Sequence, residues 1–330
     1  MDQTGVTPHH FDHIDEIEVE VDGEVETYRP TRWELFDRFA NRDWYGCFQE
    51  RTAPHDVLDT PPNPVDPATL YAPYFAPDER DRNSRNNYLS DSGGVCDDEI
   101  GGIRNNNERE RARRTCKYGM PGDPLLTLPN ERSDNRHLGP NFACRTTPLL
   151  PLTEDRVAIA QRIDDMFAIG QTGTDVGQGV MWAWRALSPQ APLTQGAPYD
   201  DRTVRKIMVV MTDGDNYLRH RIQRNNTSFG FPGDGHLSAA SGRNVTDSSS
   251  RTRVREAMDD RARAICANAQ AQNIEVFMVG FGVAEGGTGA QVLRDCASSE
   301  EHVFFPERDD DLIQVFRRIG ESIRTLRLVF

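Results

Sequence analysis

The 330-residue sequence lacks the patterns that mark several large functional classes. It has no apolar run near the roughly 20 residues needed to cross a bilayer and no basic-then-apolar leader at its amino terminus. It also has neither a Gly-x-x-x-x-Gly-Lys-Ser/Thr loop for nucleotide phosphates nor a Gly-x-Ser-x-Gly elbow for a serine nucleophile. We therefore expect no transmembrane segment or export signal in this chain, and no enzyme of those two kinds.

Excess positive charge is also missing. The chain has 38 Lys and Arg residues against 52 Asp and Glu residues, a formal net charge of −14. Nucleic-acid binding requires a basic face that neutralises phosphates, so we expect no nucleic-acid partner. The one basic run, residues 104–117, is better interpreted as a solvated surface than as an RNA-binding segment.

The cysteines lack the Cys-x-x-Cys spacing and nearby histidines of a zinc site. An even set of isolated cysteines in a loop-rich chain indicates disulfides and an oxidising compartment. Cys266 falls within a predicted helix and Cys296 near the end of the next, so both flank the strand between them and are expected to pair. The other four are expected to form the pairs Cys47 with Cys144 and Cys96 with Cys116.

The chain divides into three regions that differ in composition and in predicted secondary structure. Residues 1–43 contain an alternating Ile17, Val19 and Val21 segment followed by Asp22-Gly23, which predicts a β-hairpin ending near Tyr28. Residues 44–150 form a loop-rich insertion that contains four of the cysteines. Residues 151–330 alternate strand and helix patterns.

The last region is typical of a mostly parallel α/β sheet with helices on both faces. Helices are expected at 153–169, with Thr153 as the cap and Ile159, Ile163 and Phe167 as a stripe, and at 176–187, 251–272, 290–297 and 309–324. Strands are expected at 204–212, 274–281 and 302–305. The continuous apolar run 207–211 predicts a strand covered on both faces. A long polar insertion is expected at 217–250.

A carboxylate turn follows the first of these strands. Asp213 and Asp215 lie where open α/β sheets bind ligands, beyond the carboxyl end of a strand. About 35 residues upstream, a glycine-rich loop from Gly170 carries Thr172 into a helix. A hydroxyl from Thr172 and a carboxylate from Asp213 are suitable oxygen ligands for one Mg²⁺ ion.

These two segments resemble the metal-ion-dependent adhesion site of von Willebrand factor A (vWA) domains. In that family a Gly-x-Thr loop and a Thr-Asp-Gly turn each supply one ligand, which correspond here to Thr172 and Asp213. The remaining ligands come from an Asp-x-Ser-x-Ser motif after the first central strand, and this chain has no such motif. The resemblance therefore implies a vWA-like fold that lacks its first central strand and binds Mg²⁺ weakly or not at all. Asp215 and Asp175 are weaker ligand candidates, and they are better interpreted as a turn acid and a helix-start acid.

A narrower resemblance covers residues 44–328. The stretches Trp-Tyr-Gly-Cys-Phe-Gln-Glu-Arg from 44, Gly-Pro-Asn-Phe-Ala-Cys from 139 and Trp-Ala-Trp-Arg-Ala-Leu-Ser-Pro from 182 are similar to TadG-type proteins of bacterial Tad/Flp pilus assembly systems. That resemblance implies a non-enzymatic protein of the periplasm or cell envelope whose full-length relatives are membrane-anchored. It would support pilus assembly or surface anchoring through protein contacts.

Two alternatives remain. One is a Mg²⁺-dependent hydrolase or phosphotransferase that uses Asp213 and Asp215, although no nucleophile, general acid or phosphate cradle accompanies them. The other is a nonfunctional fragment of a longer gene product. An in-frame anchor helix and Asp-x-Ser-x-Ser motif upstream of Met1 would establish that the chain is incomplete.

Overall fold

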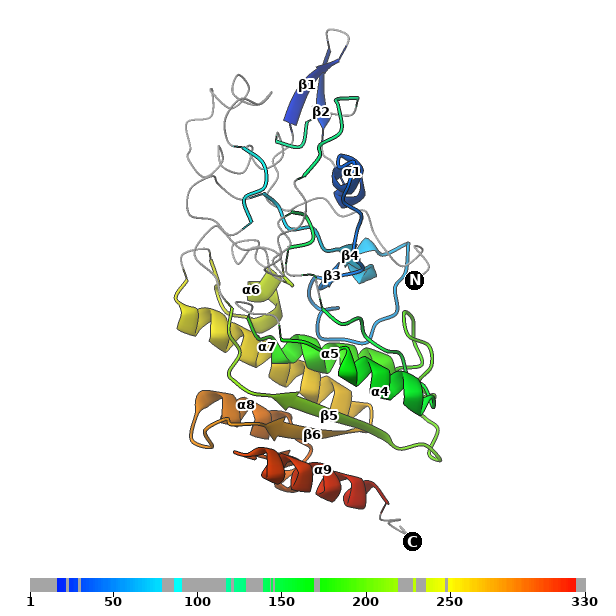
Figure 1. Ribbon diagram of the computed structural model, residues 1–330, viewed down its shortest axis with the longest axis vertical. Helices are drawn as coiled ribbons and strands as arrows, with labels where there is room; N and C mark the ends of the chain where they lie inside the picture. Colours follow the sequence, from blue (N-terminus) through cyan, green and yellow to red (C-terminus); the bar gives the residue numbers. More distant parts are fainter. Residues whose placement is uncertain are drawn as a thin grey trace.

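The computed structural model places two layers of helices around a parallel sheet, with a loop-rich part beyond one layer (Figure 1). It describes residues 17–21, 24–28, 31–78, 86–90, 117–119, 122–128, 139–142, 144, 146–168, 173–218, 228–229, 236–246 and 249–324. Within this part of the chain, no helix is both long and apolar enough to cross a membrane.

The sheet consists of β5 (Lys206–Thr212), β6 (Ile274–Gly280) and the short β7 (Val303–Phe304), in the order β5-β6-β7. All pairings are parallel, with Val209 of β5 opposite Phe277 of β6 and Met278 of β6 opposite Val303 of β7. β6 is buried on both faces, as a central strand in an α/β sheet must be. The expected parallel sheet is confirmed for these three strands.

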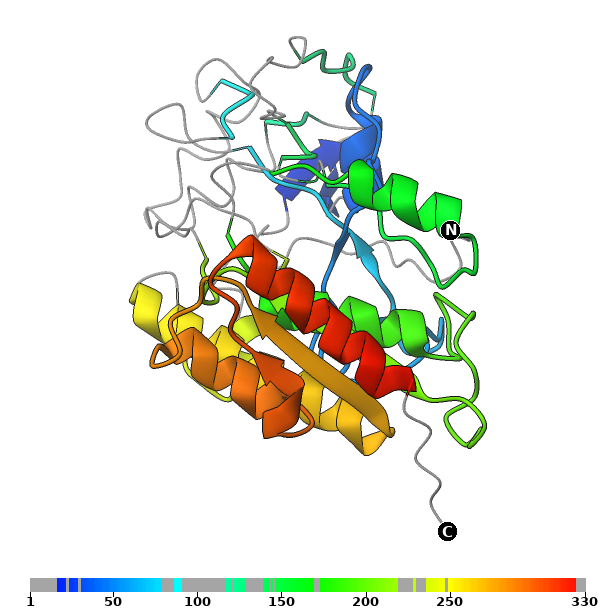
Figure 2. The same cartoon turned by 60° about the horizontal axis from the view of Figure 1, so that its bottom comes forward.

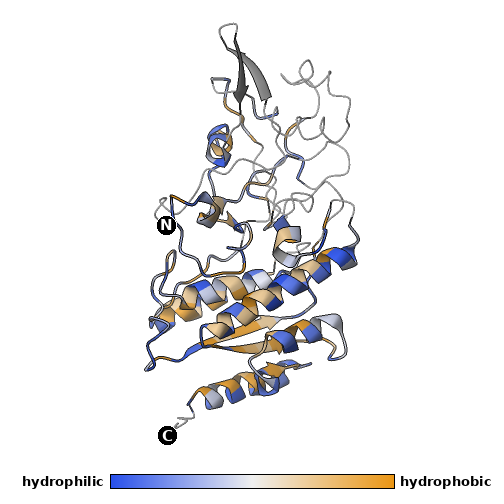
Figure 3. Cartoon of the chain, turned by 180° about the vertical axis from the view of Figure 1, so that it is seen from behind, coloured by the Kyte–Doolittle hydropathy of each residue, from blue (hydrophilic) through white to orange (hydrophobic). Residues whose placement is uncertain are grey.

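Helices cover both faces of this sheet. On one face, α5 (Val176–Leu187), α7 (Arg251–Ala271) and α8 (Thr288–Cys296) enclose a core that includes Val180, Ile265 and Leu293. On the other face lies α9 (Asp309–Arg324), whose Val315 and Ile319 pack against β6. Figure 2 views the molecule from the α9 side, and Figure 3 shows apolar residues along the strand-facing side of α9.

The expectation that both faces of β5 are covered is wrong. Met208 and Val210 point into the core beneath α5, but Val209 and Met211 on the opposite face are 38% and 54% exposed. A continuous apolar run has no periodicity that separates a covered strand from an edge strand with one open face. β5 is the edge strand of the described sheet.

The first helix of this region also differs from its prediction. α4 runs over Arg156–Asp164 with Asp155 as its cap, because the Asp155 carboxylate accepts from the backbone N–H groups of Val157 and Ala158. Thr153 instead accepts from the backbone of Asp155. The expected stripe is exposed, Phe167 lies beyond the end of the helix, and α4 buries no residue of its own.

The described part of the polar insertion contains a helix that its composition did not indicate. α6 (His236–Ser241) places Leu237 in a small core with Phe229, Val245 and Met258 of α7. A few apolar residues spread over a polar segment gave no periodic signal. The remainder of the described insertion is irregular.

The amino-terminal part begins with the predicted hairpin, β1 (Ile17–Val21) paired antiparallel with β2 (Glu24–Tyr28). α1 (Arg32–Asp37) follows, with a capping box between Thr31 and Glu34. Two short strands, β3 (Phe48–Gln49) and β4 (Ala72–Pro73), pair antiparallel, and a 3₁₀ turn, η2 (Pro67–Thr69), precedes β4. A second 3₁₀ turn, η4 (Glu300–His302), lies before β7.

An aromatic core holds the loop-rich part together. It is formed by Leu35, Phe36, Phe39, Phe75, Tyr118 and Leu128. The Phe36 and Phe75 rings meet edge to face at 5.0 Å, and the Phe75 and Tyr118 rings at 5.5 Å. This core joins residues on both sides of the boundary that the sequence analysis places at residue 43.

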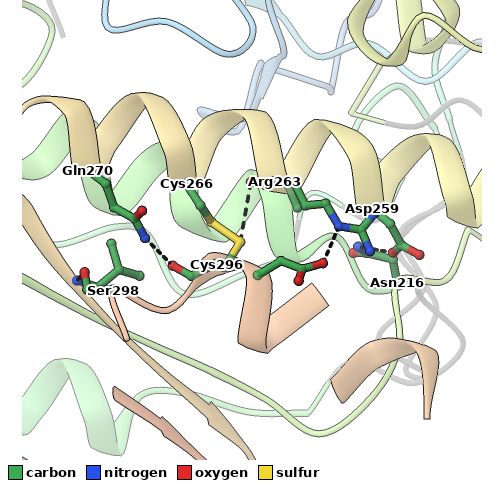
Figure 4. The surroundings of a disulfide bond; sticks show 10 residues. Asn216, Asp259, Arg263, Cys266, Gln270, Cys296 and Ser298 are labelled. Carbon is green, nitrogen blue, oxygen red and sulfur yellow. Dashed lines mark hydrogen bonds and ion pairs between the residues drawn. A yellow bond between two sulfur atoms is a disulfide. The ribbon is translucent and has the colours of Figure 1, made fainter. Parts of the chain in front are cut away.

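Two disulfides are present among the described residues, and both match predicted pairs. Cys266 of α7 is bonded to Cys296 of α8, where both side chains are fully buried beneath the sheet (Figure 4). Gln270 of α7 donates to the carbonyl of Cys296 at 2.7 Å, so the two helices are joined by a hydrogen bond as well. Cys47 is bonded to Cys144 in the loop-rich part. The predicted partners Cys96 and Cys116 lie outside the described residues.

Candidate functional site

The candidate site is the turn that follows β5 at the carboxyl edge of the sheet. The Thr212 hydroxyl donates to the Gly214 carbonyl at 3.1 Å and accepts from its N–H at 3.3 Å, which closes the turn locally. Asp213 projects from this turn and is exposed. Among the described residues, its carboxylate has no hydrogen-bond or ion-pair partner, so it is available to a ligand or a partner protein.

The glycine-rich loop comes directly against this turn. Thr174 and Tyr217 exchange two backbone hydrogen bonds, of 2.7 and 2.9 Å. A Cβ atom on Gly173 would lie 2.3 Å from the Tyr217 carbonyl oxygen, so only glycine permits this approach. The two segments singled out from the sequence are therefore adjacent at residues 173–174 and 217. Thr172 itself lies outside the described residues.

The Asp215 carboxylate is not free, because it contacts α8 and α7. Its Oδ2 accepts from the Thr288 hydroxyl at 3.1 Å and lies 3.8 Å from Arg255 Nη1. α8 begins after Gly287, and glycine has no side chain that could cap the helix. Asp215 supplies a negative charge at that helix terminus from another segment, where the helix dipole favours it.

Asn216 connects three elements behind the turn, and no sequence pattern indicated this role. Its carbonyl oxygen accepts from the N–H of Val176, the first residue of α5, at 2.8 Å. Its amide donates to Asp259 of α7 at 2.9 Å, as Figure 4 shows. Burial raises the pKa of Asp259, while the Asn216 hydrogen bond and the neighbouring arginines oppose that shift. Asn216 thus fixes the turn relative to α5 and α7.

Asp175 is the helix-start acid that the sequence predicted. It caps α5 by accepting from the Gln178 N–H at 3.0 Å, and its other oxygen accepts from the Ser228 hydroxyl at 3.2 Å. Arg261 Nη1 lies 3.7 Å from the same carboxylate. These contacts orient Asp175 toward the helix terminus.

The described residues do not by themselves fit a Mg²⁺ site. Such a site requires several oxygen ligands in near-octahedral geometry. Asp213 is uncommitted, but Asp215 and Asp175 hold helix termini, and no group of three or more His, Cys, Asp or Glu side chains in the described part is arranged to bind a metal.

A second polar cluster, which no local motif revealed, lies between the loop-rich part and the sheet. We call Glu50, Asp56, Arg185 and Arg261 the buried ion cluster. Glu50 receives two hydrogen bonds from Arg185 of α5, at 2.7 and 3.2 Å, and lies 3.3 Å from Arg261 of α7. Arg261 also donates to the Asp56 carboxylate at 3.3 Å and to its carbonyl at 3.1 Å.

Electrostatics and stacking both stabilise this cluster. Burial alone would raise the pKa of Glu50, but Arg185 and Arg261 outweigh it and hold the pKa below its ordinary value. The Arg185 guanidinium also lies against the rings of Tyr71 and Trp182, 5.0 and 4.8 Å from their centroids. The cluster therefore fixes residues 50–71 against α5 and α7, behind the Asp213 turn.

Comparisons with known proteins do not assign this chain to a family. No family model matches the sequence, and no curated protein matches it. Among solved structures, proximal thread matrix protein 1 from the mussel byssus aligns at 15% identity, covering 52% of this chain and 32% of that one, with a TM-score of 0.32. The pilus adhesin SpaC from Lactobacillus rhamnosus GG, in its open conformation, aligns at 14% identity, covering 50% and 20%, with a TM-score of 0.33. The chain spans a third or less of either protein, and similarity at this level carries no argument about fold or function.

Proposed function

We propose that this chain is a non-enzymatic, vWA-like protein of the bacterial cell envelope, similar to TadG, that supports Tad/Flp pilus assembly or surface anchoring through protein contacts. The observation that carries the proposal is the uncommitted Asp213 carboxylate on a turn beside the glycine-rich loop. A carboxylate held at the carboxyl edge of a parallel sheet is well placed for binding. The two disulfides are compatible with an extracellular or envelope location.

In this proposal the contact with the partner is made at the Asp213 turn, without catalysis. Asn216 and the Thr174–Tyr217 bridge hold the turn rigid, so little ordering entropy is lost when a partner binds. Mg²⁺ binding at Asp213 and Thr172 is expected to be at best in the millimolar range. The alternative hydrolase or phosphotransferase is less well supported, because Asp215 is held by Thr288 and Arg255.

The test compares Asp213→Ala with Asp310→Ala, which removes an exposed acid at the start of α9, in cells that carry Tad/Flp pili. Electron microscopy of surface pili and binding of the purified protein to isolated pili are the two measurements. We expect loss of pilus binding and fewer anchored pili only for Asp213→Ala. Unchanged pili after deletion of the whole gene would refute the proposal.

A further inference from the structure

In the described structure, β5 has a free edge. β5 is seven residues long, pairs with β6 on one side, and has no described strand on the other. The opposite edge of the sheet is blunted, since β7 has only two residues. Long apolar edge strands present unpaired N–H and C=O groups that pair readily with another strand.

Apolar side chains continue from this edge onto α9. Val209 and Met211 of β5 face the α9 side of the sheet, as does Ile207, which packs in the core beneath α9. On α9 itself, Phe316 is 45% exposed. We call Val209, Met211 and Phe316 the edge surface.

The direction of Phe316 follows from helix geometry. The Arg318 guanidinium stacks over Phe304 of β7, 5.1 Å from the ring centroid, so Arg318 marks the β7 side of α9. Side chains two positions apart on a helix differ in direction by about 200° around its axis. Phe316 therefore points to the side of α9 opposite Arg318, toward β5. Phe316 of α9 and the exposed residues Val209 and Met211 of β5 therefore border the same open space.

The two faces of the sheet at β5 differ in whether a partner's helix fits there. On the far face, α5 packs over β5 and α7 over β6. Neighbouring strands are about 4.8 Å apart, whereas packed helices need about 8–10 Å. Two copies paired through β5 would place their α5 helices closer than helices can pack, so a second copy does not fit. A partner strand fits if its own helix lies on the α9 face.

Charge is distributed unevenly along this edge. Arg202 and Arg324 lie at the end where β5 begins and α9 finishes, because Arg205, which is paired with Glu275, donates to the carbonyl of Ile323. Asp309 and Asp310 lie at the other end, where α9 begins. A complementary partner is apolar in the middle, acidic at one end and basic at the other.

We propose that the edge surface binds a second polypeptide that adds one β-strand to β5 and packs one amphipathic helix beside α9. The chain's own hairpin β1–β2 lies at the opposite end of the molecule from α9 (Figure 1), so it does not fill this space. The inference rests on β5 and α9 alone and does not depend on the pilus proposal. Its failure would leave the role of Asp213 unchanged.

The probe is a synthetic strand–helix peptide, with seven β-branched residues between a glutamate pair and a lysine pair, a short Gly-Asn loop and a 14-residue amphipathic helix. Fluorescence anisotropy measures its binding to the wild type and to Met211→Lys, which places a charge at an exposed position. Ile163→Lys is the matched control, because Ile163 is an exposed apolar residue on α4. A second peptide carries proline at the centre of the strand, which removes a ladder hydrogen bond.

We expect Met211→Lys and the proline peptide each to weaken binding by at least about tenfold, equivalent to about 1.4 kcal/mol, while Ile163→Lys binds like the wild type. Equal binding by Met211→Lys or by the proline peptide would overturn the proposal, as would no binding to the wild type. Light scattering provides a further check. A wild-type dimer that Met211→Lys converts to monomer would assign the edge surface to a second copy instead.

Discussion

Glu50→Gln removes one negative charge from the buried ion cluster while nearly preserving the shape of the side chain. In the wild type, Glu50 is fully buried and lies within 3.3 Å of both Arg185 and Arg261. The amide still accepts one hydrogen bond, but the two buried guanidinium groups lose their shared counter-ion. Breaking a buried pair from one side typically costs about 3 to 5 kcal/mol, because the remaining charge is uncompensated. We expect a loss of that size in the free energy of unfolding.

Urea unfolding at pH 7 under non-reducing conditions, followed by circular dichroism, measures this loss. Glu301→Gln is the control, since Glu301 is exposed, and we expect it to change stability by less than about 0.5 kcal/mol. A double variant with Arg185→Met should lose less than the sum of the two single variants, because both remove the same interaction. A loss below about 1 kcal/mol for Glu50→Gln would refute this account of the cluster.

The pH dependence gives a second measurement on the same variant. Because the pKa of Glu50 is lowered in the folded protein, its contribution is complete above its unfolded pKa, about 4.3, and is lost as pH falls through the folded pKa. The stability difference between wild type and Glu50→Gln should therefore shrink as the pH is lowered below about 4. Burial raises the pKa of Asp56 and the Glu50 charge adds to that rise, so a parallel measurement on Asp56→Asn is needed to separate its titration from that of Glu50.

Three further predictions concern the disulfide, the carboxylate turn and the core. Replacing Cys266 and Cys296 by alanine frees a loop spanning 30 residues and should lower the free energy of unfolding by about 3 to 4 kcal/mol in the chain-entropy model. Asp215→Ala should cost about 0.5 to 2 kcal/mol through loss of the α8 terminus contact, whereas Asp213→Ala should leave stability within about 0.5 kcal/mol and abolish any Mg²⁺ binding seen in a titration. Phe277→Ala in β6 should cost about 3 to 5 kcal/mol. Equal effects of the two aspartate variants would contradict the roles given to them.

Local sequence patterns predicted the local elements well. The bounds of α5 and α9 match their predictions, because a capping acid or acidic first turn marks each start and Pro189 follows the end of α5. The β1–β2 hairpin was equally readable from its alternation and its Asp-Gly turn. These signals act within a few residues, so the sequence alone contains them.

Interactions between distant segments were not predictable in this way. Glu50 and Arg185 are 135 residues apart, and nothing around either residue indicates that the two meet. Ile159 and Ile163 form a regular stripe on α4, but a stripe predicts burial only if another element covers it, and no described element does. The same reason explains why Val209 and Met211 were expected to be covered.

The two acids of the Thr-Asp-Gly-Asp turn illustrate where sequence reasoning about the site stops. Both follow the same strand and have the same chemistry, yet Asp213 is free among the described residues and Asp215 holds α8. A signal for the difference did exist 73 residues downstream. α8 begins at Thr288 directly after two glycines, which offer no side-chain cap, and a Cβ on Gly289 would lie 2.2 Å from the Asp215 carboxylate. A helix start without its own cap requires an acceptor from another segment. Because β5 and β6 are adjacent parallel strands, the turn after β5 is the segment that reaches it, which leaves Asp213 as the carboxylate available for binding.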